Sequence, residues 1–164
     1  MPGYLLDSNF FINAHRFYYP FDVVPSFWVR VQDLANRGVI GSIDKVAQEI
    51  MHGNDVLKHW IENSLPKGFF AHSSVFINEY AQIAQWANNK SEHYNAGALN
   101  EFLQAEEADA WLVAGALHGR IVVVTSEVSR PEMKVRIAIP EPCNHFGVSF
   151  CNTIEMFRNL GVTF

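Results

Sequence analysis

The sequence predicts an α/β domain in which helices cover both faces of a central, mainly parallel sheet of about four or five strands. One observation is the run IVVVT, residues 121–125, because continuous β-branched residues are typical of a strand buried on both faces of a parallel sheet. The other is the alternation of short strand-like runs with segments of helical apolar spacing. We expect residues 1–164 to form a single domain, since the chain is short enough for one.

The first half of the chain should begin with a strand at residues 4–6, which ends at Asp7 and is followed by a helix at residues 10–16. The aromatic segment FYYPFDVVP, residues 17–25, contains prolines and therefore predicts a loop. The next elements are bounded by turn or capping residues: a helix from residue 25 to Gly38, a strand at 39–43, and helices at 44–51, at 55–63 and from residue 73 or 74.

The second half should contain two consecutive helices, at residues 96–104 and 107–118, before the strand at 121–125. A loop at 126–132 then leads to a possible strand at 134–139. A shorter strand at 148–151 and a last helix complete the order, and Asn152 with Glu155 has the spacing of a capping box at the start of that helix.

Composition excludes several classes of protein. Hydrophobic residues make up 49% of the chain and charged residues 18%, which indicates a folded globule. A net charge of −5 argues against binding nucleic acid by bulk charge, but allows an enzyme that holds cations on acids. The two cysteines are too few for a disulfide framework, and no run reaches the roughly 18 apolar residues of a membrane span. The start MPGYLLDSN lacks the features of a signal peptide, so we expect a cytoplasmic location without a membrane partner.

Four acids stand at positions where a parallel sheet presents functional groups. Asp7 ends the first strand, Glu49 lies on the helix after the second, Asp109 is in the first turn of the helix before IVVVT, and Glu127 follows that strand. Carboxylates that converge without basic partners repel one another unless a cation or shared protons stabilise them. Oxygen ligands without histidine or cysteine favour Mg²⁺ or Mn²⁺ over zinc. The alternative is that the four are separate helix caps and surface acids.

Four segments, each with its acid, occur in the order found in PIN-domain nucleases: YLLDSNFFI, SIDKVAQEI, EADAWLVAGAL and IVVVTSE. The ending KVRIAIPEPCNHFGVSFCNTIEMFRNLG resembles the last strand and helix of that family. The resemblance covers nearly the whole chain and implies a PIN-like three-layer α/β/α sandwich. It departs from the family in having Glu127 where an aspartate is common. The aromatic segment and long middle helices resemble an uncharacterised branch more than the compact toxins of the VapC type.

The resemblance also implies a function, namely hydrolysis of RNA phosphodiester bonds by a Mg²⁺- or Mn²⁺-dependent endoribonuclease. Asp7, Glu49, Asp109 and Glu127 would be the catalytic, metal-binding acids, and Ser8, Asn9, Thr125 and Ser126 would give polar support. The enzyme would be the toxin component of a type II toxin–antitoxin system, with RNA as substrate, an antitoxin as protein partner and a homodimer as a possible state.

Two other functions are compatible with parts of the pattern. A PIN-like module could bind RNA or a protein without cutting, although the presence of all four acids argues against it. A phosphohydrolase of the haloacid-dehalogenase kind needs a second acid two residues after Asp7, where this chain has Asn9.

Basic and aromatic residues give candidates for substrate binding. Arg130, Lys134 and Arg136 form the densest basic group and could hold a phosphate backbone, or they could be part of a solvated loop. Arg16, with the aromatic run from Phe17 to Tyr19, could stack on unpaired bases. The alternative for these aromatic residues is packing onto the domain.

Overall fold

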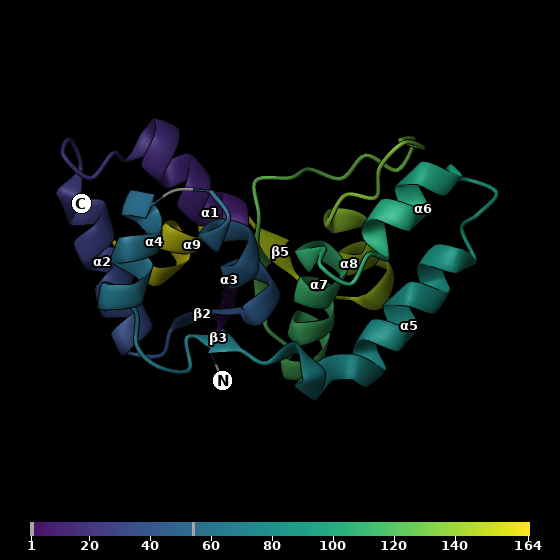
Figure 1. Ribbon diagram of the computed structural model, residues 1–164, viewed down its shortest axis with the longest axis horizontal. Coiled ribbons are helices and arrows are strands. Elements are labelled where there is room, and N and C mark those ends of the chain that lie inside the picture. Colours follow the sequence, from purple (N-terminus) through teal and green to yellow (C-terminus); the bar gives the residue numbers. More distant parts are fainter. Residues whose placement is uncertain (1, 54) are drawn as a thin grey trace.

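The computed structural model describes residues 2–53 and 55–164, and it is built around a five-stranded parallel sheet. The strand order is β3-β2-β1-β4-β5, and every pair of neighbours is parallel (Figure 1). The strands are β1 (Tyr4–Leu6), β2 (Ile40–Ile43), β3 (Phe70–Ala71), β4 (Val122–Val124) and β5 (Phe150–Cys151). The predicted α/β class with a mainly parallel sheet is therefore confirmed.

Helices flank the sheet, consistent with a three-layer α/β/α sandwich. In Figure 1, α2, α4 and α9 lie to the left of the sheet and α5, α6, α7 and α8 to its right. The helices are α1 (Ser8–Asn13), the π-helix η1 (Ala14–Tyr18), α2 (Pro25–Asn36), α3 (Asp44–Met51), α4 (Asp55–Ser64), the 3₁₀ helix η2 (Ser73–Phe76), α5 (Ile77–Asn88), α6 (Ala96–Phe102), α7 (Ala108–Gly119), α8 (Pro140–Phe146) and α9 (Thr153–Leu160). Among the described residues, no helix is long and apolar enough to cross a membrane.

Helix α7 is buried because it packs against other elements on several sides. It contacts β2 and β4 as well as α3 and α5, which explains why apolar residues surround its axis. Gly115 allows the close approach, since a Cβ atom there would lie 3.3 Å from the Leu5 side chain and 3.2 Å from the Phe76 ring. This packing holds the first turn of α7, with Asp109, beside the end of β1.

The register between β1 and β4 brings the ends of the two strands level. Leu6 pairs with Val124, and the next backbone N–H, that of Asp7, donates to the Val124 carbonyl over 3.1 Å. Asp7 and Thr125 therefore leave the sheet side by side at its carboxyl edge. This is the edge at which open α/β sheets bind their ligands.

The structure differs from the sequence predictions in a few local elements. The predicted strand at 134–139 is wrong: Ile137 and Ile139 pack into the core from irregular chain, and the Ile139 N–H donates to the Glu127 side chain instead of to a neighbouring strand. Strand β3 and helix α8 were not predicted, since each is short and gives little periodic signal. The first helix begins at Ser8, earlier than expected, and passes into the π-helix η1.

Candidate active site

Asp7 is the most buried acid at the carboxyl edge, with 3% of its surface exposed. Two hydroxyl groups bind its carboxylate: Thr125 Oγ1 donates to Oδ2 over 3.3 Å, and Ser8 Oγ donates to Oδ1 over 3.4 Å. Thr125 Oγ1 also accepts from the backbone N–H of Glu127 over 3.2 Å. One threonine side chain therefore fixes Asp7 relative to the start of the loop that carries Glu127.

Glu49 reaches this region from α3. Its Oε1 accepts from the backbone N–H of Ala108 over 3.2 Å, so that Glu49 satisfies one of the free N–H groups at the start of α7. Asp109 lies in the same first turn of α7. The packing of α3 against α7 thus places Glu49 at the start of the helix that carries Asp109.

Glu127 is held at both carboxylate oxygens. Oε2 accepts from the backbone N–H of Ile139 over 2.7 Å, and Oε1 forms an ion pair with the Arg136 guanidinium. Arg136 also lies 3.5 Å from a carboxylate oxygen of Asp109. The sequence suggested acids without a basic partner and Arg136 as a substrate contact; the structure instead pairs Arg136 with two of the acids.

Burial and the remaining repulsion between carboxylates raise the pKa values of Asp7 and Asp109. Burial, followed by the charges of Glu127 and Glu49, raises the pKa of Asp7 from 3.8 to about 7. Burial raises the pKa of Asp109 well above its ordinary value, and the charges of Asp7, Glu127 and Glu107 raise it further, while Arg136 lowers it. All four predicted acids therefore belong to one electrostatic neighbourhood.

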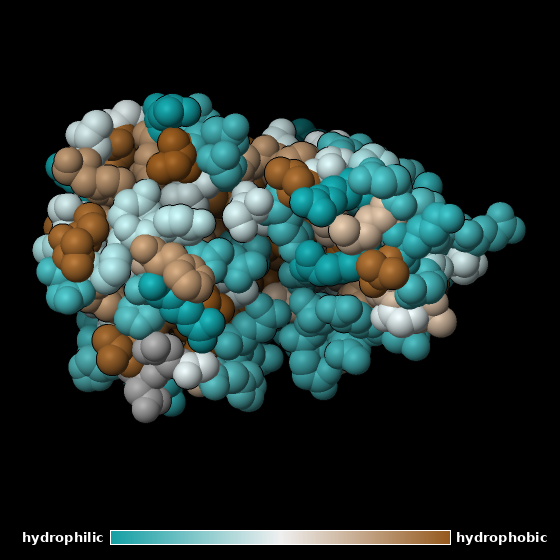
Figure 2. All heavy atoms as spheres, turned by 90° about the horizontal axis from the view of Figure 1, so that it is seen from above, coloured by the Kyte–Doolittle hydropathy of each residue, from teal (hydrophilic) through white to brown (hydrophobic). Residues whose placement is uncertain are grey.

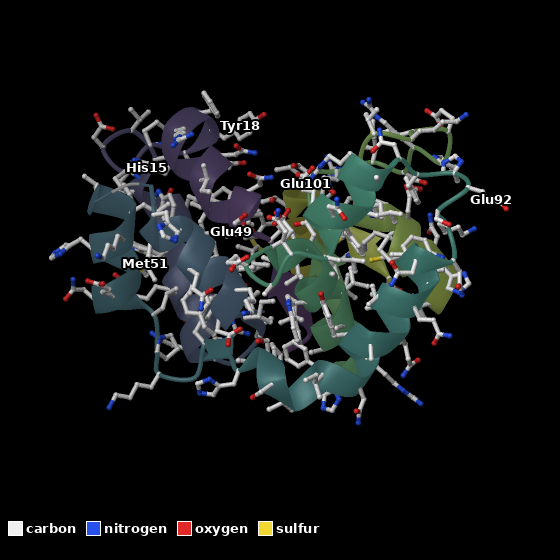
Figure 3. All side chains as sticks on the ribbon, turned by 45° about the vertical axis from the view of Figure 1, so that its right-hand side comes forward. His15, Tyr18, Glu49, Met51, Glu92 and Glu101 are labelled. Atoms are coloured by element: carbon white, nitrogen blue, oxygen red, sulfur yellow. The ribbon has the colours of Figure 1, made fainter. Side chains whose placement is uncertain are left out.

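Glu107 is a fifth acid in this neighbourhood that the sequence analysis missed. It is the residue immediately before α7, and burial with the charges of Glu49 and Glu101 raises its pKa. In Figure 3, Glu49 on α3 and Glu101 on α6 lie near the centre of the molecule, between its two groups of helices. The signal available in the sequence was the spacing E-A-D, which places Glu107 two residues before Asp109.

The donor set suits a hard divalent cation in its chemistry, because it offers carboxylate oxygens around a buried acid. The side chains are not gathered for this purpose: in residues 2–53 and 55–164, no group of three or more His, Cys, Asp or Glu is placed to hold a metal ion. Arg136, the Ile139 N–H and the Ala108 N–H occupy carboxylate oxygens that a cation would need. Metal binding would require at least the Arg136 pair to open.

The other predicted residues divide into two groups. Of the polar support residues, Thr125 and Ser8 bind Asp7, whereas Asn9 and Ser126 line a cavity beside it. Of the basic residues, Arg16, Arg130 and Lys134 are exposed, and no side-chain ion pair joins them to an acid in the described part of the chain.

The aromatic segment also divides. Tyr19 packs onto the domain, with its ring stacked on Phe27 at a centroid distance of 4.2 Å and an interplanar angle of 2°. Phe17 and Tyr18 are each 69% exposed. Seen from the top of Figure 1, hydrophobic residues are scattered among hydrophilic ones (Figure 2).

Comparison with known families adds one assignment. Residues 4–164 match the model of a family described as a domain of unknown function, DUF4411. The chain belongs to this family. The matched part of this DUF4411 chain contains all four predicted acids, Arg136 and Glu107. Searches of curated proteins and of solved structures found no match.

Proposed function

We propose that the chain is a PIN-like, Mg²⁺- or Mn²⁺-dependent endoribonuclease. The observation that supports the proposal is that Asp7, Asp109 and Glu127, from three separate elements, lie near enough at the carboxyl edge of a parallel sheet for their charges to interact, and that Glu49 also acts on Asp7. Acids that raise one another's pKa by their charges are stabilised by a bound cation. Such perturbed groups are typical of functional sites.

The four acids share one part in this proposal, and the residues around them have others. Asp7, Glu49, Asp109 and Glu127 would hold the metal, which supplies Lewis acidity and a nucleophilic water of lowered pKa. Thr125 and Ser8 orient the Asp7 carboxylate through their hydroxyl groups. Once Glu127 no longer holds it, Arg136 has the planar guanidinium suited to a phosphate of the substrate. Arg16, Arg130 and Lys134 are candidates for further backbone contacts.

We extend the proposal to the biological setting that the sequence resemblance implies. The enzyme would act in the cytoplasm as the toxin component of a type II toxin–antitoxin system, with RNA as its substrate, an antitoxin as its protein partner and a homodimer as its form in solution. An adjacent reading frame encoding a small DNA-binding protein is the expected genetic arrangement.

A direct test is Mn²⁺-dependent cleavage of end-labelled single-stranded RNA. We expect cleavage by the native protein to fall by at least about a hundredfold in Asp7→Asn and in Asp109→Asn, since each removes a metal-binding charge. Asp33→Asn is the matched control, because Asp33 on α2 is an exposed acid whose side chain pairs with Arg37, the residue that follows the helix. Circular dichroism establishes that the variants fold, and cleavage unchanged in both site variants would overturn the acid site.

The pairing of Arg136 with Glu127 and Asp109 favours a second candidate, a PIN-like module that binds RNA or a protein without cutting it. In that case the guanidinium would replace the cation permanently. Calorimetric titration with Mn²⁺ separates the two: the nuclease binds the ion through the acids and loses binding in Asp109→Asn, whereas the non-cleaving module shows no binding in either protein.

A further inference from the structure

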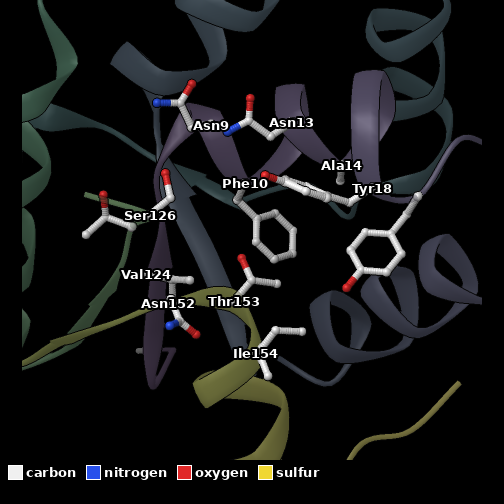
Figure 4. A pocket seen from close by; sticks show the side chains of 12 residues that line it. Asn9, Phe10, Asn13, Ala14, Tyr18, Val124, Ser126, Asn152, Thr153 and Ile154 are labelled. Atoms are coloured by element: carbon white, nitrogen blue, oxygen red, sulfur yellow. The ribbon is translucent and has the colours of Figure 1, made fainter. Parts of the chain in front are cut away.

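A cavity of about 200 Å³ adjoins the acid site at the carboxyl edge of the sheet. Helix α1 and η1 form one wall, the residues after β4 form the second, and the start of α9 forms the third (Figure 4). Thr125 belongs both to this cavity and to the acid site, because its hydroxyl donates to Asp7. A group bound in the cavity would therefore lie directly beside the proposed reaction centre.

The lining is uncharged and mostly apolar, and several hydrogen-bonding side chains belong to it. All 12 lining residues are neutral, and they include Asn9, Asn13, Asn152 and Thr153 around the ring of Phe10. A cavity without a cationic side chain is poorly suited to a phosphate, which Arg, Lys or clustered N–H groups recognise. Neutral donors and acceptors around an aromatic surface instead suit a flat, neutral, polar-edged ring.

Several of these polar groups have capacity left for a ligand. In the described part of the chain, no hydrogen bond engages the side-chain amides of Asn9 and Asn13, and neither amide is sealed in the core. Asn152 uses its Oδ1 to accept from the backbone N–H of Glu155 in the capping box, which leaves its NH₂ group as a donor. The cavity thus offers two complete amides and one additional donor.

Tyr18 gives the cavity an aromatic rim. It is the last residue of the π-helix η1, whose wider turn is an unusual feature that is often found at functional sites. Its side chain lines the cavity and is nevertheless 69% exposed, so its ring is available to a ligand (Figure 4). Neighbouring Phe17 is equally exposed but does not line the cavity.

We propose that this cavity binds one unpaired base of a single-stranded RNA, the base of a nucleotide adjoining the cleaved phosphate. Unpaired bases are recognised in proteins by stacking on aromatic rings and by hydrogen bonds to their edges. The volume is below the roughly 300 Å³ at which pockets for drug-sized ligands begin, which suits a single ring system. The choice of ligand rests on the proposed RNA-cleaving function, and the cavity would add base preference to it.

The test uses nucleosides, so that it does not depend on cleavage. Adenosine, guanosine, cytidine and uridine are each titrated into the ¹⁵N-labelled protein, with ribose 5-phosphate as the probe that lacks a base. We expect at least one nucleoside to shift the side-chain amide resonances of Asn9 or Asn13, and ribose 5-phosphate to leave them in place. Absence of shifts with all four nucleosides would overturn the proposal. A cavity that accepts a side chain of a protein partner would give that result.

Variants sharpen the test. We expect Tyr18→Ala to weaken binding of a fluorescein-labelled single-stranded RNA about tenfold, in the range found for loss of one base–aromatic stack. Asn13→Leu should weaken nucleoside binding as well, because it replaces an amide with an apolar group. Phe17→Ala is the matched control and should bind as the native chain does; equal weakening in Phe17→Ala and Tyr18→Ala would contradict the assignment.

The two proposals fail separately. If the chain does not cleave RNA but the amide resonances still shift with nucleosides, the base-binding site is supported and the nuclease proposal is rejected. If RNA is cleaved without any nucleotide preference and the amide resonances do not shift, the nuclease proposal is supported and the base-binding site is rejected.

Discussion

The carboxyl ends of β1 and β4 border two regions of opposite character. On one side, Asp7, Glu127 and Arg136 form part of a charged cluster, in which burial and the charges of Glu127 and Glu49 raise the pKa of Asp7. On the other, Asn9 and Ser126 belong to an uncharged cavity. Asn9 follows Asp7 by two positions at the start of α1, and Ser126 directly precedes Glu127 after β4, so charged and uncharged residues alternate over very short distances along the chain.

Under the proposed function, this arrangement bears on how a chain with a net charge of −5 would bind a polyanion. Five of the 17 acids lie in one electrostatic neighbourhood with Arg136, and the neighbouring cavity is lined by neutral residues alone. Thr125 joins the two regions, since it lines the cavity and donates to Asp7. Changes on the charged side should therefore alter pH dependence and metal affinity, whereas those on the neutral side should alter base preference.

The largest effect on stability is expected from Asp7→Asn. The folded protein keeps a proton on Asp7 up to about pH 7, whereas the unfolded chain releases it near the ordinary pKa of 3.8. This residue therefore favours folding at low pH, and its contribution is lost as the pH rises from about 4 through about 7. At pH 8 with EDTA, Asn avoids a buried charge, and we expect the Tm to rise by at least about 2 °C, the change that 1 kcal/mol produces in a domain of this length.

Differential scanning fluorimetry across the pH range measures this effect. The advantage of Asp7→Asn should shrink towards pH 4, where the native aspartate is protonated as well. If Asp7→Asn were less stable than the native chain at pH 8, the destabilising effect that we assign to the buried Asp7 charge would be contradicted.

A smaller effect is expected at the residue that joins the two regions. Thr125→Val removes the hydroxyl that binds Asp7 and leaves the Glu127 N–H without its acceptor. We expect the free energy of unfolding to fall by up to about 1 kcal/mol, the net contribution of a typical hydrogen bond, because the Glu127 N–H is only partly buried. Thr125→Ser is the control, because it keeps the hydroxyl. In urea denaturation, Thr125→Val should lose more unfolding free energy than Thr125→Ser. Equal losses would show that the methyl group of Thr125, and not its hydroxyl, is responsible.

The smallest effect on stability should come from Arg136→Met. The Arg136 side chain is 44% exposed, so its ion pairs with Glu127 and Asp109 contribute only about 0–1 kcal/mol. Its effect on metal affinity should be clearer: without the competing guanidinium we expect Mn²⁺ to bind a few-fold more tightly, measured by calorimetry. Arg130→Met is the matched control, since that side chain makes no ion pair with the described acids; equal affinities would show that Arg136 does not compete with the ion.

The sequence located site residues best where a polar residue directly follows a predicted strand. Asp7 directly after an apolar strand, and the polar residues after IVVVT, could be placed because the carboxyl ends of parallel strands share an edge. The fold class followed from the same regular alternation of strands and helices.

What the sequence could not give depends on contacts between distant segments. The hydrogen bond from the Ala108 N–H to the Glu49 carboxylate depends on how α3 packs on α7, which no local sequence pattern specifies. Arg136 lies in an irregular segment whose course is set by the burial of Ile137 and Ile139 and by the bond from Ile139 to Glu127. The cavity beside the site joins α1, β4 and α9, and no single stretch of sequence indicates it.

The two outer strands of the sheet have a consequence for any protein that binds this chain. Strands β3 and β5 contain only two residues each, so the sheet presents very short rows of backbone groups at its borders. Short borders resist pairing with strands from other chains, which protects against aggregation. They also leave little template for a partner that adds a strand, and a protein partner is therefore expected to recognise side chains on the helices and loops of this domain.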